Sequence, residues 1–517
     1  MKVGMKDDMH RMDAAAESVY GLPTAVLMEN AGCKTAEVMA EMLGGLAGRT
    51  VCVLAGSGNN GGDAFSAVRH MVGAGAHVRA FLAGDPAHFG DAAASMYHCV
   101  QKMGVEVHPL DGDRDWDRLQ LAMKFSDGIV DGILGTGFQG ELRKKTLRLI
   151  ELVNASGRPV LSIDIPSGVE ADTGRVSTVA IHASHTLTLA LPKPGLFLSP
   201  GGDCAGEVDV DGIGMPLLLL EDASLHQALL DADAARALLP ARPRSAHKGS
   251  CGRILVIAGS RGMMGAATLA SRAALRAGAG IVTLAVPESL HDVMEGKLTE
   301  VMTVPLPESA PGTIAGDAAL EKLLQLAPDY DAVLLGPGLG RSYETGELVR
   351  AFMQRAKQPV VLDADGIYAY TGQADALTAC ENVPVLTPHL GEMARLLGVS
   401  VGELREDLIG ITRDAAKEYQ AVFVVKSEST IVVYPDGDVY FTTTGNPGMA
   451  TAGCGDVLAG TIVGLMKQTE PAAAPLLGVW LHGRAGDLAY AALGDGLLAS
   501  DVLEHLPAAR KALLEKK

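Results

Sequence analysis

The sequence predicts an α/β protein made of two successive domains. Short runs rich in β-branched residues alternate with stretches of helical period, a pattern typical of parallel sheets covered by helices. The pattern begins afresh near residue 253, where a second series of strand-like runs starts. A chain of 517 residues is also too long for one core, because hydrophobic cores stop growing at roughly 250–300 residues. We therefore predict two α/β domains.

Each half of the chain supplies its own predicted strands. In the first half they lie within residues 51–56, 77–84, 128–135, 158–168 and 185–195. In the second half they lie within residues 253–260, 280–287, 331–338, 358–366, 383–389 and 421–437. Between the halves, prolines and basic residues at 231–252 interrupt the periodic pattern. We place the boundary between residues 222 and 240, and we assign the domains to residues 1–222 and 223–517.

The composition is that of a folded acidic protein. Hydrophobic residues make up 48% and charged residues 20% of the chain, which is typical of globular domains. The net charge of −18 disfavours nucleic acid as a partner. Seven scattered cysteines without a C-x-x-C pair indicate reduced thiols, and no apolar run is long enough for a membrane span. We expect a cytoplasmic protein without membrane partners, which forms a homo-oligomer as such folds commonly do.

Polar and glycine-rich segments follow three predicted strands of the first half. GSGNNGGD at residues 56–63 follows the first strand, Asp131 precedes GTG at 135–137, and Asp164 precedes PSG at 166–168. Glycines at a strand-to-helix turn allow backbone N–H groups to point at an anion, although Gly-x-Gly alone is equally typical of close helix packing. Because the carboxyl ends of parallel strands meet at one edge of a sheet, we predict a ligand crevice there.

These segments resemble the NAD(P)H-hydrate epimerase family. GSGNNGGD, DGILGTG, SIDIPSG and ADTG, followed by LTLALPKPG, occur in the family's order over nearly all of residues 1–215. The resemblance implies a Rossmann-like three-layer αβα domain, a potassium ion held by Asn60, Asp131 and Ser167, and Asp164 as the acid/base group. It implies substrate contacts by Asn59, Asn60, Gly61, Gly62, Asp63, Gly135, Thr136, Gly137, Phe138, Gln139, Gly140, Glu141 and Asp164. A capping or turn role is the alternative for Asp164.

A single carboxyl group can catalyse this epimerisation. The reacting ring carbon bears a hydroxyl and a nitrogen, so a proton donor and acceptor suffices to open and reclose the C–O bond. Oxygen ligands also suit a hard monovalent cation, which can fix the loops that carry a pyrophosphate.

A second glycine-rich loop lies near the end of the chain. GNPGMATAGCGD at residues 445–456 enters an apolar run of helical period that starts at Val457. The free N–H groups and the dipole of a helix N-terminus stabilise a phosphate. Asp456 then lies in the first turn, where an aspartate often only caps the helix. Its position after four glycines favours a base that takes a proton from a hydroxyl attacking phosphorus.

With Lys426 on a preceding strand, this loop resembles the ribokinase-like fold, and within it the ADP-dependent NAD(P)H-hydrate dehydratase family over about residues 240–510. Seven motifs occur in order: HKGSCGRILVIAGS, GAATLASRAALRAGAGIVTLA, LLGPGLG, VLDADG, LTPHLGEMARLL, VVKSEST and GNPGMATAGCGDVLAG. The resemblance implies contacts to the hydrate by Gly280, Gly338, His389 and Asp456, although His389 also suits a helix cap. It implies ADP contacts by Lys426, Ser427, Glu428, Ser429, Thr430, Asn446, Pro447, Gly448, Met449, Ala450, Thr451, Ala452, Gly453, Cys454 and Gly455, with magnesium accompanying the ADP.

The two resemblances together predict a repair enzyme for hydrated NADH and NADPH, known as NADHX and NADPHX. The first domain interconverts the R and S hydrates, and the second dehydrates the S hydrate at the expense of ADP. Ser427 and Cys454 replace a glycine and a hydroxyl residue of the family pattern, so the choice between ADP and ATP stays open. Two alternatives also stay open: a ribokinase-like small-molecule kinase with an N-terminal binding module, and a first domain that serves as a scaffold without catalysis.

Overall fold

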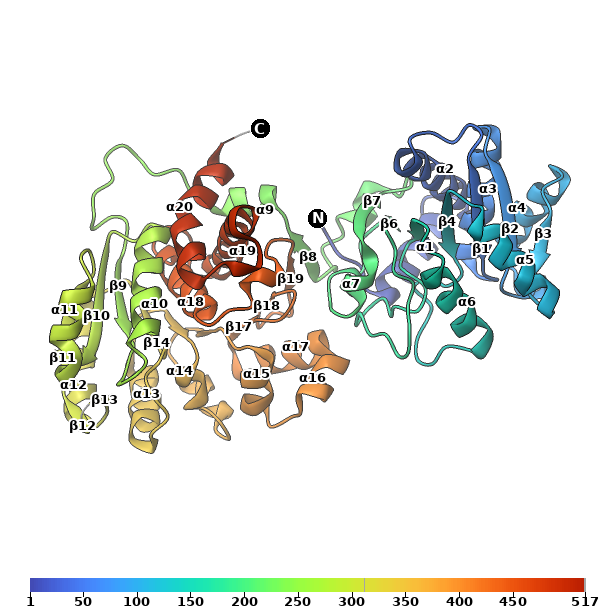
Figure 1. The fold of residues 1–517 in the computed structure, drawn as a ribbon. Coiled ribbons are helices and arrows are strands. Elements are labelled where there is room, and N and C mark those ends of the chain that lie inside the picture. Colours follow the sequence, from blue (N-terminus) through green and yellow to red (C-terminus); the bar gives the residue numbers. More distant parts are fainter. Residues whose placement is uncertain (311, 516–517) are drawn as a thin grey trace. The chain divides into compact units, whose positions relative to one another are not determined.

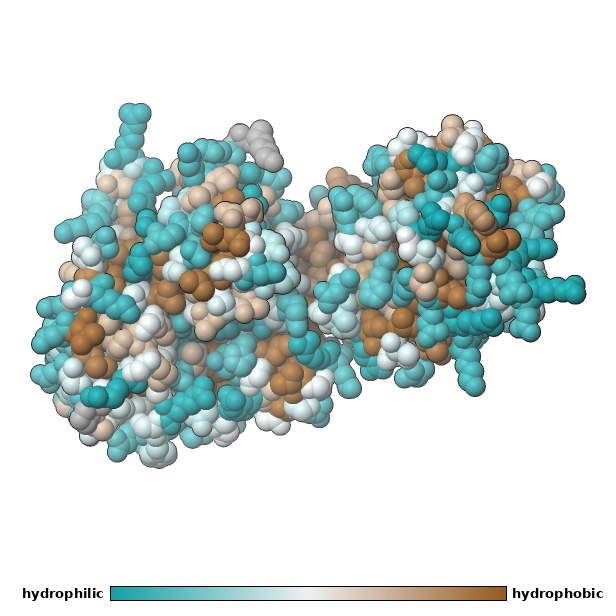
Figure 2. Space-filling model, viewed as in Figure 1, coloured by the Kyte–Doolittle hydropathy of each residue, from teal (hydrophilic) through white to brown (hydrophobic). Residues whose placement is uncertain are grey.

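The computed structural model describes residues 1–310 and 312–515, which form two compact units (Figure 1). One unit comprises Lys2–Gln227, and the other begins at Ala228 and includes Met1. Across the described residues, no helix combines the length and the apolar character that a membrane crossing requires. All seven cysteines are unpaired, as predicted. On the face drawn in Figure 2, apolar residues lie in small groups among polar ones.

The first unit is built on a seven-stranded sheet. Its strands are β1 (Thr50–Ala55), β2 (His77–Leu82), β3 (Val107–Pro109), β4 (Gly128–Gly132), β5 (Val160–Ile163), β6 (His185–Leu189) and β7 (Glu207–Asp211). All neighbouring strands are parallel, in the order β3-β2-β1-β4-β5-β6-β7. The direction of winding reverses between β1 and β4, which is where open α/β sheets bind ligands.

Helices cover both faces of this sheet. They are α1 (Lys6–Ser18), α2 (Thr24–Leu43), α3 (Asn59–Gly73), α4 (Asp91–Lys102), α5 (Asp113–Lys124), α6 (Lys144–Ala155), α7 (Gly201–Ala205) and α8 (Leu217–Leu220), with 3₁₀ turns η1 (Pro86–His88) and η2 (Pro194–Leu196). Successive strand residues point to opposite faces. Val51 and Val53 accordingly pack with apolar residues of α1–α4, whereas Cys52 and Leu54 pack with α5 and α6. The predicted three-layer αβα arrangement is confirmed.

The second unit contains a ten-stranded sheet and a small hairpin. The strands are β8 (Gln227–Leu230), β9 (Arg253–Ile257), β10 (Ile281–Pro287), β11 (Met302–Leu306), β14 (Ala332–Leu335), β15 (Val360–Leu362), β16 (Val385–Leu386), β17 (Val422–Val425), β18 (Ile431–Val433) and β19 (Val439–Thr442), and the hairpin is β12 (Glu308–Ala310) with β13 (Thr313–Ile314). Their order is β11-β10-β9-β14-β15-β16-β17-β18-β19-β8. The strands from β11 to β17 are parallel, and β17, β18 and β19 are antiparallel. This unit is therefore also α/β, as predicted.

Two helices of the second unit pack with their backbones in direct contact, and one of them begins at the end of the glycine-rich loop. The helices are α9 (Ala232–Leu238), α10 (Met264–Ala277), α11 (His291–Lys297), α12 (Asp317–Leu326), α13 (Tyr343–Arg355), α14 (Asp365–Tyr368), α15 (Leu390–Leu397), α16 (Val401–Glu406), α17 (Leu408–Tyr419), α18 (Cys454–Leu465), α19 (Ala474–Leu493) and α20 (Ala499–Leu514), with 3₁₀ turns η3 (Glu288–Leu290), η4 (Ala327–Asp329), η5 (Ala374–Ala379), η6 (Pro447–Met449) and η7 (Gly494–Gly496). Helices α10 and α18 touch through backbone: a Cβ on Gly460 would lie 2.2 Å from the Ala270 carbonyl oxygen, and one on Gly464 would lie 2.5 Å from that of Ala274. Only glycine allows this approach.

Candidate active sites

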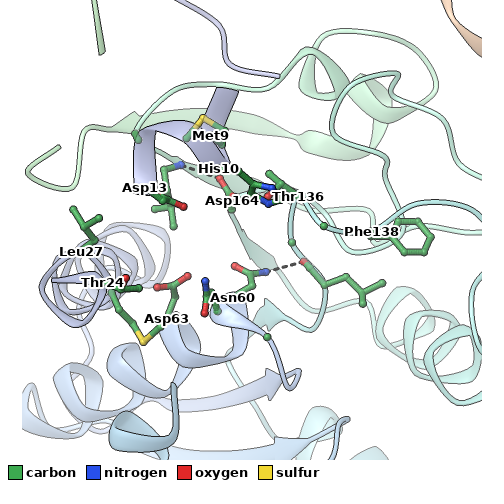
Figure 3. A pocket seen from close by; sticks show the side chains of 18 of the residues that line it. Met9, His10, Asp13, Thr24, Leu27, Asn60, Asp63, Thr136, Phe138 and Asp164 are labelled. Atoms are coloured by element: carbon green, nitrogen blue, oxygen red, sulfur yellow. Dashed lines mark hydrogen bonds between the residues drawn. The ribbon is translucent and has the colours of Figure 1, made fainter. Parts of the chain in front are cut away.

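A cavity of about 440 Å³ lies at the carboxyl ends of β1, β4 and β5 in the first unit (Figure 3). This is the edge at which the sequence predicts a ligand crevice. The predicted residues that line the cavity are Asn59, Asn60, Asp63, Gly135, Thr136, Gly137, Phe138 and Asp164. Helix α1 adds Met9, His10 and Asp13, which sequence reasoning missed.

Asp164 follows β5 with its backbone in the left-handed region, at a φ of 68°. Its Oδ1 atom accepts hydrogen bonds from the Leu189 backbone at 3.1 Å and from the Thr188 hydroxyl at 3.4 Å, and it pairs with the Lys193 ammonium. The Lys193 side chain is 1% exposed. Among the described residues nothing hydrogen-bonds to Oδ2, so this oxygen remains free for a ligand. Lys193 lies within the segment LTLALPKPG, but the sequence did not indicate that it contacts Asp164.

The predicted potassium ligands lie around a buried carboxyl group. Asp131 is 0% exposed, and its oxygens accept hydrogen bonds from the Ser162 hydroxyl at 2.8 Å and the Ser167 backbone at 2.9 Å. Burial raises the pKa of Asp131, and no cationic side chain of the described chain pairs with it. Asn60 donates from Nδ2 to the Leu134 carbonyl at 2.7 Å, which leaves its buried Oδ1 without a partner. A buried amide oxygen without a partner and a buried carboxyl group without a cationic partner are oxygen ligands that fit a hard monovalent cation.

The other predicted positions of the first site do not line this cavity. Gly61 and Gly62 serve close packing, since a Cβ on Gly61 would lie 2.0 Å from the Gly56 carbonyl oxygen. Gly140 donates its N–H to the Glu170 carboxylate at 2.9 Å. Gln139 and Glu141 flank it on the same loop, beyond the part that reaches the cavity.

A second cavity, of about 430 Å³, lies beside the N-terminus of α18 in the second unit. Predicted ADP-binding residues line much of it, namely Lys426, Ser427, Glu428, Thr430, Asn446, Met449, Ala450, Thr451, Cys454 and Gly455. Ser429, Pro447, Gly448, Ala452 and Gly453 do not line it. Gly445 and His389 also line it, together with residues that we had not predicted, namely Thr442, Thr444, Leu458, Val479, His482 and Gly483.

Lys426 places a half-buried positive charge beside this helix N-terminus. Its Nζ lies 3.0 Å from the Asp363 carboxylate and 3.9 Å from that of Glu392. Burial alone would lower the pKa of Lys426, but these two carboxylates raise it. A Cβ on Gly455 would come within 3.0 Å of Nζ, so the glycine keeps the space between the ammonium and the helix open. The lysine, the N–H groups and the helix dipole together form an anion site.

Asp456 is the third residue of α18, as expected for the first turn. Burial, followed by repulsion from Asp363, raises the pKa of Asp456 to about 7, against the opposing attraction of Lys426. A carboxyl group that titrates near neutrality is well suited to accept a proton during turnover. Asp363 and Glu392 belong to the motifs VLDADG and LTPHLGEMARLL, but sequence reasoning had not selected them.

The four predicted contacts to the hydrate separate into two places. Gly338 follows β14 next to β9, and its carbonyl accepts a hydrogen bond from the Ser260 hydroxyl at 2.8 Å. His389 follows β16 and lines the second cavity, while its Nδ1 caps α15 by accepting from the Gly391 backbone at 3.0 Å. Gly280 instead precedes β10, at the amino end of a parallel strand, and its N–H bonds to the Gly252 carbonyl at 3.0 Å. Gly280 therefore lies at the opposite end of the parallel strands from Gly338 and His389, and neither glycine lines the second cavity.

Cys454 and His482 meet at the start of α18. Burial raises the pKa of the Cys454 thiol to about 11, so the group is a weak neutral donor beside the anion site. Burial also lowers the pKa of His482 to about 4, although its ring donates to the Cys454 carbonyl, which opposes the shift. The Nε2 atom of His482 is buried without a partner.

These observations define an α/β protein with two domains, each of which has a cavity lined by a lysine that pairs with an aspartate. A family described as YjeF-related protein N-terminus matches residues 24–195, and one described as NAD(P)H-hydrate dehydratase matches residues 254–508. The chain is 42% identical to a bifunctional NAD(P)H-hydrate repair enzyme of Moorella thermoacetica, over 98% of this chain and 96% of the relative. It is 38% identical to the enzyme of that name from Thermofilum pendens, over 100% and 97%. The chain belongs to the family of bifunctional NAD(P)H-hydrate repair enzymes.

A solved structure is also similar to the second domain. It is the ADP/ATP-dependent NAD(P)H-hydrate dehydratase of Bacillus subtilis, co-crystallised with ATP and Mg²⁺. It is 30% identical to this chain, covers 55% of this chain and 98% of its own, and has a TM-score of 0.47.

Proposed function

We propose that this chain repairs NADHX and NADPHX at the two sites described above. The first domain epimerises the R and S hydrates, and the second dehydrates the S hydrate with consumption of ADP. The observation that carries the proposal is that a chain matched to the family over 98% of its length has a cavity in each domain. At each cavity a lysine that lines it pairs with an aspartate: the buried Lys193 with Asp164, and the half-buried Lys426 with Asp363.

In the first domain, Asp164 is the acid/base residue. Lys193 fixes its Oδ1, so the free Oδ2 faces the hydrated ring and exchanges a proton with the 6-hydroxyl. The N-terminus of α3, at residues 59–63, and the loop of residues 135–141 contact the dinucleotide. Asn60, Asp131 and Ser167 would hold a potassium ion, whose charge compensates the buried carboxylate and stiffens these loops.

In the second domain, ADP lies in the cavity beside α18. Lys426 and the helix N-terminus bind its phosphates, and Asp456 takes the proton of the 6-hydroxyl as this oxygen attacks the terminal phosphorus. The phosphate so formed is a better leaving group than hydroxide, and its loss with a ring proton restores the dihydronicotinamide. Magnesium would be bound mainly through the ADP phosphates and water, because no group of three metal-ligating side chains occurs among the described residues.

A repair assay tests this function. The protein is incubated with a mixture of R and S hydrates and ADP, and the absorbance of the reduced nicotinamide is followed. We expect complete recovery, whereas recovery of the S half alone would show an inactive first domain. Failure with ADP and with ATP would overturn the proposal. A stable phosphorylated product with net nucleotide consumption would instead support a small-molecule kinase.

Replacing Lys426 by methionine should weaken ADP binding. Charged hydrogen bonds contribute about 1.5–3 kcal/mol, so we expect the Kd for ADP to rise about 10–100-fold. Titration calorimetry measures this change, with thermal unfolding as a check because Asp363 loses its partner. The matched control is Lys467→Met, which removes an exposed lysine of the same domain that pairs with Asp331. An unchanged Kd in the Lys426 variant would remove this residue from the nucleotide site.

Potassium should stabilise the first domain as well as support epimerisation. A ligand that binds only the folded state adds about 2.7 kcal/mol at 100 times its Kd. We therefore expect the Tm of the first domain to rise when potassium replaces tetramethylammonium at equal ionic strength, and epimerisation to rise with it. In Asn60→Leu, which removes the unpartnered Oδ1, the rise in Tm should vanish. A wild-type Tm that is the same in both salts would refute this metal site.

A further inference from the structure

Helix α1 brings a carboxyl group that has no assigned role into the first cavity. Asp13 lines the cavity with Met9 and His10, which lie on the same helix. Among the described residues, no hydrogen bond or ion pair engages its side chain. In Figure 3, Asp13 and Asp164 lie on one side of the cavity, with Asp63 and Asn60 on the other. Asp13 is therefore a free polar group in a cavity that is built to hold a ligand.

The electrostatic surroundings of Asp13 and Asp164 differ. Asp164 is paired with the buried ammonium of Lys193. Asp13 has no such partner: desolvation and then Asp164 raise its pKa, while Lys193 and His10 act in the opposite direction. Asp63, on α3, is 8% exposed and also faces the cavity without a hydrogen bond among the described residues. Three carboxyl groups thus face one cavity in which the lysine is paired with Asp164, and of the two without a lysine partner Asp13 lies on the same side as Asp164.

Two neighbouring carboxyl groups in opposite protonation states form an acid/base pair. We propose that Asp13 is a second catalytic residue of the epimerase reaction, which donates a proton to the ring nitrogen N1 while Asp164 accepts one from the 6-hydroxyl. This inference rests on the proposed epimerase function and deepens it. The nitrogen and the hydroxyl are both bonded to C6, so two groups on the same side of the cavity are placed to serve them.

This route replaces the opening of the C–O bond that we expected from the sequence with opening of the C6–N1 bond, and its bonds balance without any further reactant. The C6–N1 bond breaks, its electron pair moves to N1, and N1 receives the proton of Asp13. The hydroxyl oxygen loses its proton to Asp164 and forms the C6 aldehyde. After rotation about C5–C6, N1 attacks the other face of the aldehyde, and both protons return. The ring closes as the opposite epimer, and the two carboxyl groups recover their starting states.

The variant Asp13→Asn tests this role. We expect kcat for conversion of the R hydrate to fall about 10²–10⁴-fold, the range typical of general acid catalysis. The alkaline limb of the wild-type pH profile, where Asp13 loses its proton, should disappear. The Kd for NADPHX should change less than twofold, and Asp13→Glu should recover part of the rate. The matched control is Glu17→Gln, an exposed residue of α1 that does not line this cavity.

Two readouts separate this inference from the proposed function. If the wild-type protein fails to convert the R hydrate, the epimerase function itself is refuted. If the wild-type converts it and Asp13→Asn keeps the same rate and pH profile, Asp13 has no catalytic role. Turnover in H₂¹⁸O gives a further check: ring opening retains the hydroxyl oxygen, so we expect far less than one ¹⁸O per event. Incorporation of one ¹⁸O per event would overturn the C6–N1 step.

Discussion

Asp456→Asn is expected to lose ADP-dependent dehydration while interconversion of the R and S hydrates continues. The amide keeps the size of the side chain but cannot accept the proton of the 6-hydroxyl. Removal of a general base lowers rates about 10²–10⁴-fold. Release of phosphate from ADP in the presence of the S hydrate measures the effect. Asp414→Asn, on the exposed side of α17 and outside the cavity, is the matched control.

The pH profile of the same reaction gives an independent check on Asp456. Its pKa is raised to about 7, so the group is protonated below that pH and ionised above it. Because only the ionised form accepts a proton, kcat for dehydration should rise as the pH increases through about 7. Asp456→Asn should lack this limb. A wild-type rate that is flat from pH 6 to 8 would contradict the assignment of the base.

Asp164→Asn should stop conversion of the R hydrate and leave dehydration of the S hydrate at its normal rate. The asparagine still accepts hydrogen bonds from Leu189 and Thr188, but it cannot exchange a proton, so we expect a loss of about 10²–10⁴-fold. With ADP present, half of a racemic hydrate mixture should persist. The exposed Asp117→Asn on α5 serves as control.

Stability must be followed in the Asp164 variant. Lys193 is 1% exposed and would lose its carboxylate partner, which lowers the free energy of unfolding. Thermal unfolding of both domains separates this effect from catalysis. If a folded Asp164→Asn protein consumes the R hydrate at the wild-type rate, Asp164 has only a structural role.

Most of the fold was predictable because buried parallel strands leave continuous apolar runs. Every predicted strand region contains a strand, usually shorter than predicted because the terminal glycines and polar residues belong to the loops. Several strands that we did not predict, such as β3, β7 and β11, lie at the edges of the sheets, whereas the unpredicted β19 lies between β18 and β8. β7 has the sequence EVDVD, in which three of the five residues are acidic, so it lacks the apolar run by which we predicted the other strands. Edge strands are only partly buried, so their composition resembles that of loops.

Site residues were predictable from the sequence where they lie in a short motif that fixes the local backbone conformation. Glycines at a strand end fix a turn, and Asn60 and Gly135 accordingly both line the first cavity. Partners from distant elements could not be found in this way. Asp13 lies on a helix that precedes the first strand, and only packing of α1 over the sheet brings it near Asp164. Gly280 shows the reverse case: the resemblance implied a contact to the hydrate, but this residue precedes β10, at the opposite end of the parallel strands from Gly338 and His389.

The contact between α10 and α18 has a consequence for how ADP enters and leaves. At Gly460 and Gly464 the two backbones are so close that α18 cannot slide or rotate against α10 without a collision. We therefore expect the N–H groups at the N-terminus of α18, which we propose to bind the phosphates, to stay in place between turnovers and to require no rearrangement when the nucleotide arrives.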